Sequence, residues 1–431
     1  MALCSAIVWR LIDLENQRVN SILLLFVVFG GFFIFGLSEN VKGPALPAMQ
    51  SEFKLHESQL GFLLALNSLG YLLACSFTSN LSNKIGIKWI GILAFASMTL
   101  SGIFMFLSKG YTSLTLSYFM LYLGNGILEI GLGIMAARIF TKNTGTMMNL
   151  AHFFYGLSSI GAPILGASMM GWNVLNGELG WRGMYLMVLS LSILPIIPSF
   201  FGRFPEEHQK DGESTSFRNL IRDPIAWKIV AILSFGVVSE ISIGSWLVYY
   251  LENAYDWSLN RASGMLSSFF LFFTLSRLIA GPITDKIGYT LSIMIFSAFS
   301  GVCSLAAVFS GEKGAILFAI AGIGIAPIYP TVMALLAKQY SKGVGTAITF
   351  TVTLLGISSI IGNLLVGFII DFFNRVFGQK SVGGEIIGLQ AGYVFIAGMA
   401  ILCSVYSVSL YKTLRNQNKV EGKVKGSEMG F

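Results

Sequence analysis

The chain has 431 residues, of which 54% are hydrophobic and only 11% carry a charge. Ordinary soluble domains carry roughly 25% charged residues, so this chain lacks the polar side chains that a water-exposed surface needs. The formal net charge is +7, but the basic residues are scattered singly between apolar runs, which argues against a nucleic-acid-binding patch. The composition predicts an integral membrane protein.

Twelve apolar segments follow one another along the chain. A hydrocarbon core about 30 Å thick needs roughly 20 apolar residues in a helix. Segments of that kind begin near residues 21, 58, 88, 112, 145, 184, 227, 261, 289, 313, 345 and 388. We expect the first segment to continue to about residue 48, because Glu39 and Lys42 interrupt its apolar run without an obvious turn.

One long polar segment divides these spans six and six. We predict an N-terminal six-helix half at 1–202, a cytoplasmic linker at 203–226, a C-terminal six-helix half at 227–413 and a cytoplasmic tail at 414–431. When the two termini and the linker are placed on one side of the membrane, that side holds 20 of the 28 lysines and arginines and the other side holds 8. Positive charge favours the cytoplasmic side, so both termini should be cytoplasmic in a multi-pass protein of the cell membrane.

The two predicted halves carry matching sequences. Residues 145–160 read GTMMNLAHFFYGLSSI and residues 345–360 read GTAITFTVTLLGISSI, an offset of 200. Gly86 matches Gly288 at an offset of 202, and the pair Ser38 and Glu39 matches Ser239 and Glu240 at an offset of 201. Four matches at nearly one offset indicate a duplicated six-helix unit. An even number of helices in each unit makes the repeat parallel, with its axis along the membrane normal.

The loop after the eighth span, GPITDKIG at 281–288, resembles the G-x-x-x-D-[RK]-x-G loop of the major facilitator superfamily. The resemblance implies an all-α polytopic membrane protein with twelve transmembrane helices in two parallel six-helix halves. It also implies that these loops form a cytoplasmic gate, although a purely structural turn is the alternative. We expect Asp285 to cap a helix start. The expected gate residues are Arg277, Gly281, Asp285, Lys286 and Gly288, with Asn83, Lys84 and Gly86 in the degenerate first-half loop.

Within that superfamily, the chain resembles most closely the fucose–glucose–galactose proton symporters. The stretches that carry the resemblance are GNGILEIGLG at 124–133, NLAHFFYGLSSIGAPI at 149–164, SEISIGSW at 239–246 and GIAPIYPT at 324–331. One position departs from the pattern, because Gly43 stands where the sugar permeases carry an aspartate. Glu39 lies four residues earlier, on the same helical face, and is the candidate to replace that carboxylate.

Ionisable residues near the middle of a bilayer are costly, by roughly 3 kcal/mol for an aspartate on insertion scales, and therefore mark candidate functional sites. Glu129 lies in mid-span with no cation nearby in its own helix. Burial favours the protonated form of a carboxyl group, so Glu129 is expected to hold a proton and release it when the cavity fills with water. Glu240 and His152 are further candidates for proton coupling. Glu39 is a fourth, and a structural ion pair with Lys42 is its alternative role.

A sugar site needs aromatic faces for C–H surfaces and amides or carboxylates for hydroxyl groups. The side chains that offer these at mid-span depths are Asn67, Tyr71, Tyr155, Trp246, Tyr250, Tyr329 and Asn363. Some of them are expected only to pack or to face lipid. The cysteines have no metal-ligand spacing and there is no Walker A motif, so we expect no metal site and no cofactor.

The sequence thus predicts a proton-coupled symporter for a monosaccharide or similar small polar solute, acting as a monomer in the lipid bilayer with no enzymatic activity. The main alternative is a proton-driven exporter of drugs or metabolites. It is favoured by Gly161-Ala162-Pro163, which resembles the fifth-helix signature of superfamily antiporters. A membrane sensor or enzyme on a transporter-like scaffold is the third alternative, and no catalytic cluster in the sequence supports it.

Overall fold

The computed structural model describes residues 2–139, 144–174, 177–204, 217–340, 344–377 and 384–428. Most of the predicted linker, residues 205–216, lies outside the described residues, and so does the side chain of the expected gate residue Asn83. The described part contains twelve segments that are helical, long enough and apolar enough to cross a membrane. They are Val19–Phe53, Glu57–Thr78, Ile87–Phe106, Tyr111–Ala136, Leu150–Met170, Gly180–Phe201, Pro224–Tyr255, Leu259–Ile287, Tyr289–Phe309, Gly311–Gln339, Thr346–Phe377 and Ile386–Asn416. The predicted polytopic all-α fold is confirmed.

The chain groups into two compact units, one of residues 1–54 and 66–209 and the other of residues 55–65 and 210–431. The first unit contains α1 (Ala2–Asn40), α2 (Lys42–Phe53), the part of α3 (Glu57–Ile85) from residue 66 on, α4 (Ile87–Phe106), α5 (Tyr111–Ile139), α6 (Thr144–Met170), α7 (Gly180–Ser190) and α8 (Ile193–Phe201). A small antiparallel hairpin of β1 (Asn173–Val174) and β2 (Gly177–Glu178) precedes α7. Within this unit α1 packs along α6, and α4 packs along α5.

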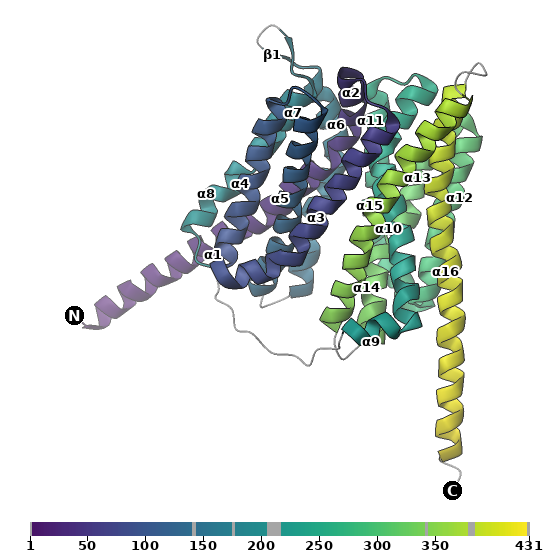
Figure 1. The fold of residues 1–431 in the computed structure, drawn as a ribbon. Coiled ribbons are helices and arrows are strands. Elements are labelled where there is room, and N and C mark those ends of the chain that lie inside the picture. The colour runs from purple at the N-terminus through teal and green to yellow at the C-terminus, as the bar shows by residue number, and fades with distance from the viewer. Residues whose placement is uncertain are drawn as a thin grey trace. The chain divides into compact units, whose positions relative to one another are not determined.

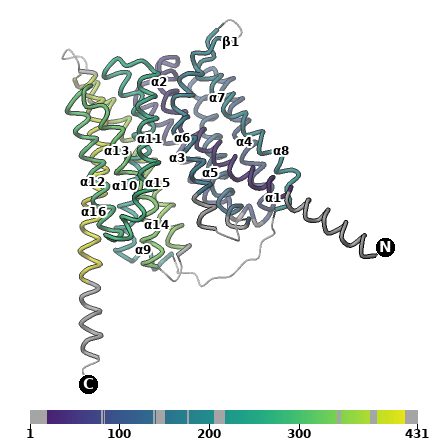
Figure 2. The backbone as a smooth tube through the Cα atoms, turned by 180° about the vertical axis from the view of Figure 1, so that it is seen from behind, coloured from purple at the N-terminus to yellow at the C-terminus, as the bar shows by residue number. Residues whose placement is uncertain are grey.

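The second unit contains α9 (Phe217–Arg222), α10 (Pro224–Tyr255), α11 (Leu259–Ile287), α12 (Tyr289–Phe309), the 3₁₀ turn η1 (Gly311–Gly314), α13 (Ile316–Ile325), α14 (Ile328–Gln339), α15 (Val344–Phe377) and α16 (Gly384–Glu428). Figures 1 and 2 show α12 lying along α16, and α10 packs against both α15 and α16. The side chain of Asp223 caps α10 by accepting a hydrogen bond from the amide of Ile225 (2.8 Å). Tyr340 donates a second hydrogen bond to Asp223 (2.6 Å), and burial together with this carboxylate raises the pKa of the Tyr340 hydroxyl.

Three of the twelve spans are broken into two helices, and a proline explains each break. Proline has no amide hydrogen for the carbonyl group four residues earlier, so the helical ladder loses one bond. The prolines are Pro44, Pro195 and Pro330, and the carbonyl groups that lose the amide donor four residues later are those of Asn40, Leu191 and Ala326. The first break separates α1 from α2 at Val41. The first span continues past Glu39 and Lys42 to Phe53, as expected, but it consists of two helices.

The loops at the matching glycines share one backbone conformation. Gly86 precedes α4 with φ 86° and ψ 151°, and Gly288 precedes α12 with φ 89° and ψ 152°. This region of backbone space is essentially restricted to glycine. The two loops therefore share a backbone conformation at this glycine, even where their sequences differ.

The expected capping role of Asp285 is wrong. Asp285 lies in the last turn of α11 and is exposed, while Gly288 is the N-cap residue of α12 and no side chain caps that helix. Lys84 and Lys286 occupy the last turns of α3 and α11, where a cation interacts favourably with the partial negative charge of a helix C-terminus.

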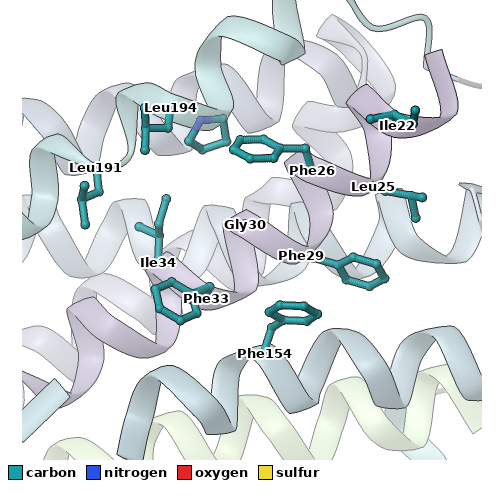
Figure 3. Close-up of a pocket in the computed structure, with 11 residues that line it drawn as sticks. Ile22, Leu25, Phe26, Phe29, Gly30, Phe33, Ile34, Phe154, Leu191 and Leu194 are labelled. Atoms are coloured by element: carbon teal, nitrogen blue, oxygen red, sulfur yellow. The ribbon is translucent and has the colours of Figure 1, made fainter. Parts of the chain in front are cut away.

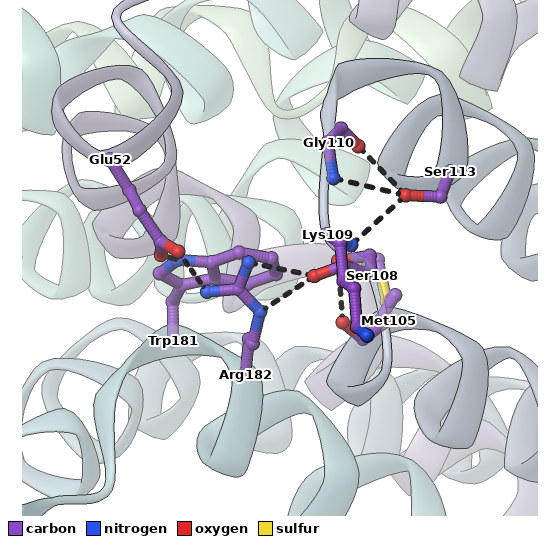
Figure 4. Close-up of polar contacts among 8 residues, drawn as sticks. All are labelled: Glu52, Met105, Ser108, Lys109, Gly110, Ser113, Trp181 and Arg182. Carbon is purple, nitrogen blue, oxygen red and sulfur yellow. Dashed lines mark hydrogen bonds and ion pairs between the residues drawn. The ribbon is translucent and has the colours of Figure 1, made fainter.

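A cluster of tryptophan, arginine and glutamate links two helices and a turn of the first unit (Figure 4). The indole Nε1 of Trp181 donates to Glu52 (2.7 Å), and the Arg182 guanidinium forms an ion pair with the same carboxylate. Arg182 also donates through Nη2 to the carbonyl oxygen of Ser108 (2.8 Å). The cluster thereby joins the end of α2, the start of α7 and the turn after α4.

The second unit carries the same chemistry at other positions. Trp257 donates to Glu312 (2.7 Å), and Arg261 pairs with the same Glu312 oxygen at 3.0 Å. The Arg261 guanidinium stacks 3.7 Å from the centroid of the Trp257 ring. Both units therefore combine an indole donor and an arginine on one carboxylate, an arrangement that the sequence did not reveal because the partners lie far apart along the chain.

Candidate functional site

Glu129 is partly buried on α5, where the hydroxyl group of Tyr71 on α3 donates a hydrogen bond to its carboxylate. The two helices approach closely because α5 carries a glycine next to this pair. A Cβ atom at Gly126 would lie 2.7 Å from the Cβ of Ala74 and 2.8 Å from the carbonyl oxygen of Tyr71. The small residue therefore brings Tyr71 within reach of Glu129. Tyr71, expected to bind substrate, is also a direct partner of the expected coupling carboxylate.

Glu39 lies at the end of α1 in a network of polar partners. Lys42 pairs with one of its carboxylate oxygens at 3.1 Å, and the side-chain amide of Asn125 donates to the other at 3.0 Å. Ser38 in turn donates to the Asn125 oxygen (3.3 Å). The ammonium group of Lys42 also lies 5.4 Å from the centroid of the Tyr122 ring. The expected ion pair between Glu39 and Lys42 forms, and it supports the structural role of Glu39.

Asn125, which donates to Glu39, lies on the same helix as Glu129. It is fully buried on α5, one helical turn before Glu129 and on the same face. The charge of Glu39 also lies within electrostatic range of Glu129. Sequence reasoning missed Asn125, although it stands inside the quoted stretch at 124–133 and four residues from Glu129.

Asn67 lies on α3, one turn before Tyr71. Its side chain is 3% exposed, and neither its amide nitrogen nor its oxygen has a hydrogen-bond partner among the described residues. A buried amide without partners loses its hydrogen bonds to water without replacing them. Asn67 is therefore available to a ligand or to ordered water, close to the pair of Tyr71 and Glu129.

The two expected residues on α6 pack their rings against aromatic side chains of α1. His152 is exposed, and its ring packs against Phe32 at 5.0 Å between centroids. Tyr155 packs its ring against Phe35 at 5.2 Å, and its carbonyl oxygen accepts a hydrogen bond from Ser159 (2.8 Å).

In the second unit, Glu240 lies partly buried near the middle of α10. Arg277 on α11 is its charged neighbour and lies within electrostatic range, although the two residues do not form an ion pair. Arg277 was expected to belong to the gate loop. The structure places it on α11, one helical turn before Gly281, where its Nε donates to the carbonyl oxygen of Ala326 at 3.2 Å.

The other expected residues of the second unit are mostly packed inside it. Trp246 is fully buried, contacts Tyr249 edge-on, and has no hydrogen-bond partner for its indole nitrogen among the described residues. Tyr250 is also fully buried and bonds to the hydroxyl of Tyr255 (3.2 Å) within an aromatic cluster. Asn363 is buried on α15, and Tyr329 is partly buried near the start of α14. The gate residue Gly281 is exposed within α11.

A groove of about 630 Å³ in the first unit is lined almost entirely by apolar side chains (Figure 3). Phe29 of α1 and Phe154 of α6 stack across it at 5.2 Å between ring centroids. Its lining contains none of the expected polar residues, so it does not fit a polar solute. In the described part of the chain, no group of three or more His, Cys, Asp or Glu side chains is arranged to hold a metal ion.

Comparison with known proteins places these features in a family context. The family described as Major Facilitator Superfamily matches residues 28–314 and, in a second match, residues 239–428. An uncharacterized MFS-type transporter of Yersinia pestis is 25% identical over 345 residues, which cover 78% of this chain and 86% of the relative. Other relatives are named as a probable nitrate transporter of Staphylococcus haemolyticus (25% identical; 70% of this chain and 78% of the relative covered) and a gentisate transporter of Corynebacterium glutamicum (21%; 96% and 92%).

Solved structures share the fold at low sequence identity. A crystal structure of the nucleoside transporter NupG superposes with a TM-score of 0.75 and 14% identity, covering 91% of this chain and all of the other. The fucose:proton symporter of E. coli superposes with a TM-score of 0.62 and 16% identity, covering 91% and 99%. The names of these relatives span several substrate classes, so a particular closeness to the fucose symporters is not confirmed.

Proposed function

Because this chain belongs to the Major Facilitator Superfamily and is a multi-pass membrane transporter, we propose that it moves a small polar solute across the membrane by proton symport with alternating access. The observation that carries the proposal is the pairing of Tyr71 with Glu129 beside the buried amides of Asn67 and Asn125. A carboxyl group that can be neutral or charged, next to groups that bind hydroxyls, links protonation to solute binding.

We propose a monosaccharide as the solute. Tyrosine, asparagine and glutamate side chains gather in the first unit, and they are the groups that recognise sugar rings and hydroxyls. The fold is also shared with a D-xylose–proton symporter and the fucose symporter. A shared fold does not identify the substrate, and the names of the sequence relatives include nitrate and gentisate transporters. The proposal of a monosaccharide therefore depends on the side chains of the site.

A proton-driven exporter of drugs or metabolites is the second candidate. Its support is the sequence Gly161-Ala162-Pro163 within α6, which continues through the proline as one helix. A thermal-shift series with sugars, polyols and cationic drugs separates the two proposals, because a ligand raises the stability of the state it binds. Stabilisation by cationic drugs alone would favour export.

We further propose that both termini and the linker are cytoplasmic, on the 20-to-8 distribution of positive charge. In a variant whose four native cysteines are replaced, a single cysteine at Gly212 should resist an impermeant thiol reagent applied to intact cells. It should become labelled once the cells are permeabilised. Ready labelling of intact cells would overturn the orientation.

The coupling role of Glu129 is tested with Glu129→Gln. Glutamine copies the protonated side chain and cannot lose a proton, so the variant should bind and exchange substrate but lose accumulation driven by a pH gradient. The measurement uses proteoliposomes and a radiolabelled sugar that stabilises the wild type in the thermal-shift series. Counterflow without a gradient reports exchange, and uptake with an imposed gradient reports coupling.

Two matched variants complete this test. Glu129→Ala removes the hydrogen-bonding group and should lose binding as well as accumulation. His152→Gln should leave gradient-driven accumulation unchanged if the exposed histidine has no coupling role. If Glu129→Gln accumulates the sugar as steeply as wild type, Glu129 does not couple transport to protons, and Glu240 becomes the next candidate.

A further inference from the structure

Arg277 is a cation inside the span Leu259–Ile287, where a charged side chain is costly unless a partner or a water-filled cavity meets it. It is partly buried, and its guanidinium lies 4.3 Å from the centroid of the Phe273 ring. A guanidinium offers five N–H donors in a fixed plane. The role of Arg277 depends on which acceptors these N–H groups bind.

One donor has a structural use. Pro330 cannot supply an amide hydrogen to the carbonyl oxygen of Ala326, and the Arg277 Nε supplies one instead, at 3.2 Å. This bond accounts for the arginine at the break between α13 and α14. Among the described residues, the two terminal nitrogens of Arg277 have no hydrogen bond or ion pair. Four N–H groups therefore remain for another acceptor.

Glu240 does not accept hydrogen bonds from these N–H groups. It lies close enough for its charge to interact with Arg277, but the two side chains are not in contact, and the carboxylate accepts no hydrogen bond from the described side chains. Opposite charges inside a membrane gain most from direct contact, because the surroundings screen them weakly. Because the two side chains do not pair, the terminal nitrogens of Arg277 and the carboxylate of Glu240 keep their capacity to bind a third group.

We propose that the terminal nitrogens of Arg277 bind a carboxylate group of the transported solute, so that the solute is a sugar acid or a similar small hydroxylated carboxylate. The proposal rests on the proposed function, because it specifies the solute that the transporter carries. A planar guanidinium matches a carboxylate with two parallel hydrogen bonds, whereas a neutral sugar cannot neutralise the charge.

Glu240 then acts as a competitor for the same cation. An ionised Glu240 partly neutralises Arg277, and a neutral residue at this position leaves the arginine free for the negatively charged solute. Arg277 is the charged residue within electrostatic range of Glu240, and it lies on α11, which packs against α10. Removing the charge of Glu240 should therefore tighten binding of the acid, while removing the charge of Arg277 should weaken it.

The experiment compares two pairs of probes that differ only in a carboxylate replacing a CH₂OH group: D-glucuronate with D-glucose, and D-gluconate with D-sorbitol. Dissociation constants are measured on the purified full chain. Wild type should bind at least one acid about tenfold or more tightly than its neutral partner, since a charge-assisted hydrogen bond contributes more than a neutral one. Glu240→Gln should tighten binding of that acid.

Arg277→Gln is made in a Pro330→Ala background, which restores an amide donor to the Ala326 carbonyl and separates the structural bond from ligand binding. Relative to Pro330→Ala alone, the double variant should lose about tenfold or more in affinity for the acid and keep its affinity for the neutral probe. Melting temperatures without ligand check that both proteins are folded.

Equal binding of acids and neutral probes in wild type, or no binding of either acid, overturns the inference. An equal loss of acid and neutral binding in the Arg277 variant also overturns it. Tight, Arg277-dependent binding of an acid that is not accumulated under a pH gradient supports the inference and contradicts the proposed proton symport. Binding and gradient-driven uptake of glucose without binding of the acids supports the symport and contradicts this inference.

Discussion

Glu39 and Glu240 occupy matching positions in the two halves of the duplicated sequence, each directly after a serine. Glu39 is held by Lys42 at 3.1 Å and by Asn125 at 3.0 Å. Glu240 has Arg277 nearby but no ion pair among the described residues. The repeat thus keeps the residue type while the partners change. We infer that the first carboxylate holds its unit together and the second is open to ligands.

The largest expected effect is on the free energy of unfolding, and it tests the contrast between Glu39 and Glu240. Glu39→Gln should destabilise the protein by about 3 kcal/mol, because it leaves the buried Lys42 ammonium without its counter-charge. Glu240→Gln should change stability by less than about 1 kcal/mol, because no direct contact is broken. Thermal unfolding of both variants in the same detergent measures the difference.

The double variant Glu39→Gln, Lys42→Met is the matched control. It removes both charges, so much of the lost stability should return. If Glu39→Gln alone is as stable as wild type, the ion pair has no structural role and Glu39 joins the candidates for coupling. If Glu240→Gln destabilises as strongly as Glu39→Gln, the contrast between the halves is wrong.

The glycines before α4 and α12 offer a second comparison, in which the two halves should behave alike. Gly86→Ala and Gly288→Ala should each destabilise by about 1–3 kcal/mol, because alanine is strained at φ near +86° to +89°. A Cβ atom would meet nothing within 4 Å at either site, so the cost comes from the backbone alone. Unfolding by heat or denaturant measures it.

Gly264→Ala in α11 is the control for this pair. It also has open space around a Cβ atom but no positive φ, so alanine should be neutral or slightly stabilising there. A clear difference between Gly86→Ala and Gly288→Ala would mean that the two loops are constrained differently, despite their equal backbone angles.

Much of the fold could be predicted from the sequence, because the length of apolar runs reports directly on the bilayer. All twelve spans begin within about five residues of the predicted positions. The breaks at Val41 and after Ser190 were missed, since an apolar run continues through a break and only the position of a proline reveals it. The capping role of Asp285 failed because helix ends depend on the exact loop geometry.

The candidate site was less predictable, because contacts between helices leave no periodic signal. The Glu39–Lys42 pair could be predicted since both residues share one local stretch of chain. The partnership of Tyr71 with Glu129 could not, because 58 residues separate them and a glycine on α5 decides their approach. Arg277 was assigned to the neighbouring loop from its motif, whereas its contact with Ala326 depends on Pro330 in another span.

The smallest expected effect on stability concerns Asp285, in the last turn of α11, which is one of the motif positions where the halves differ. Asp285 matches Asn83 at the offset of the two glycines, so Asp285→Asn gives the second loop the residue of the first. Asp285 is exposed and forms no ion pair within the described residues, so the substitution should change the free energy of unfolding by less than about 0.5 kcal/mol.

If this loop gates the cytoplasmic face, Asp285→Asn should slow transport by up to about tenfold, or 1.4 kcal/mol on the barrier. Binding should stay unchanged, because gating changes rates more than affinity. The measurements are initial uptake rates and dissociation constants for Asp285→Asn and for the reciprocal variant Asn83→Asp. A folded Asp285→Asn protein that no longer binds substrate would rule out a gate.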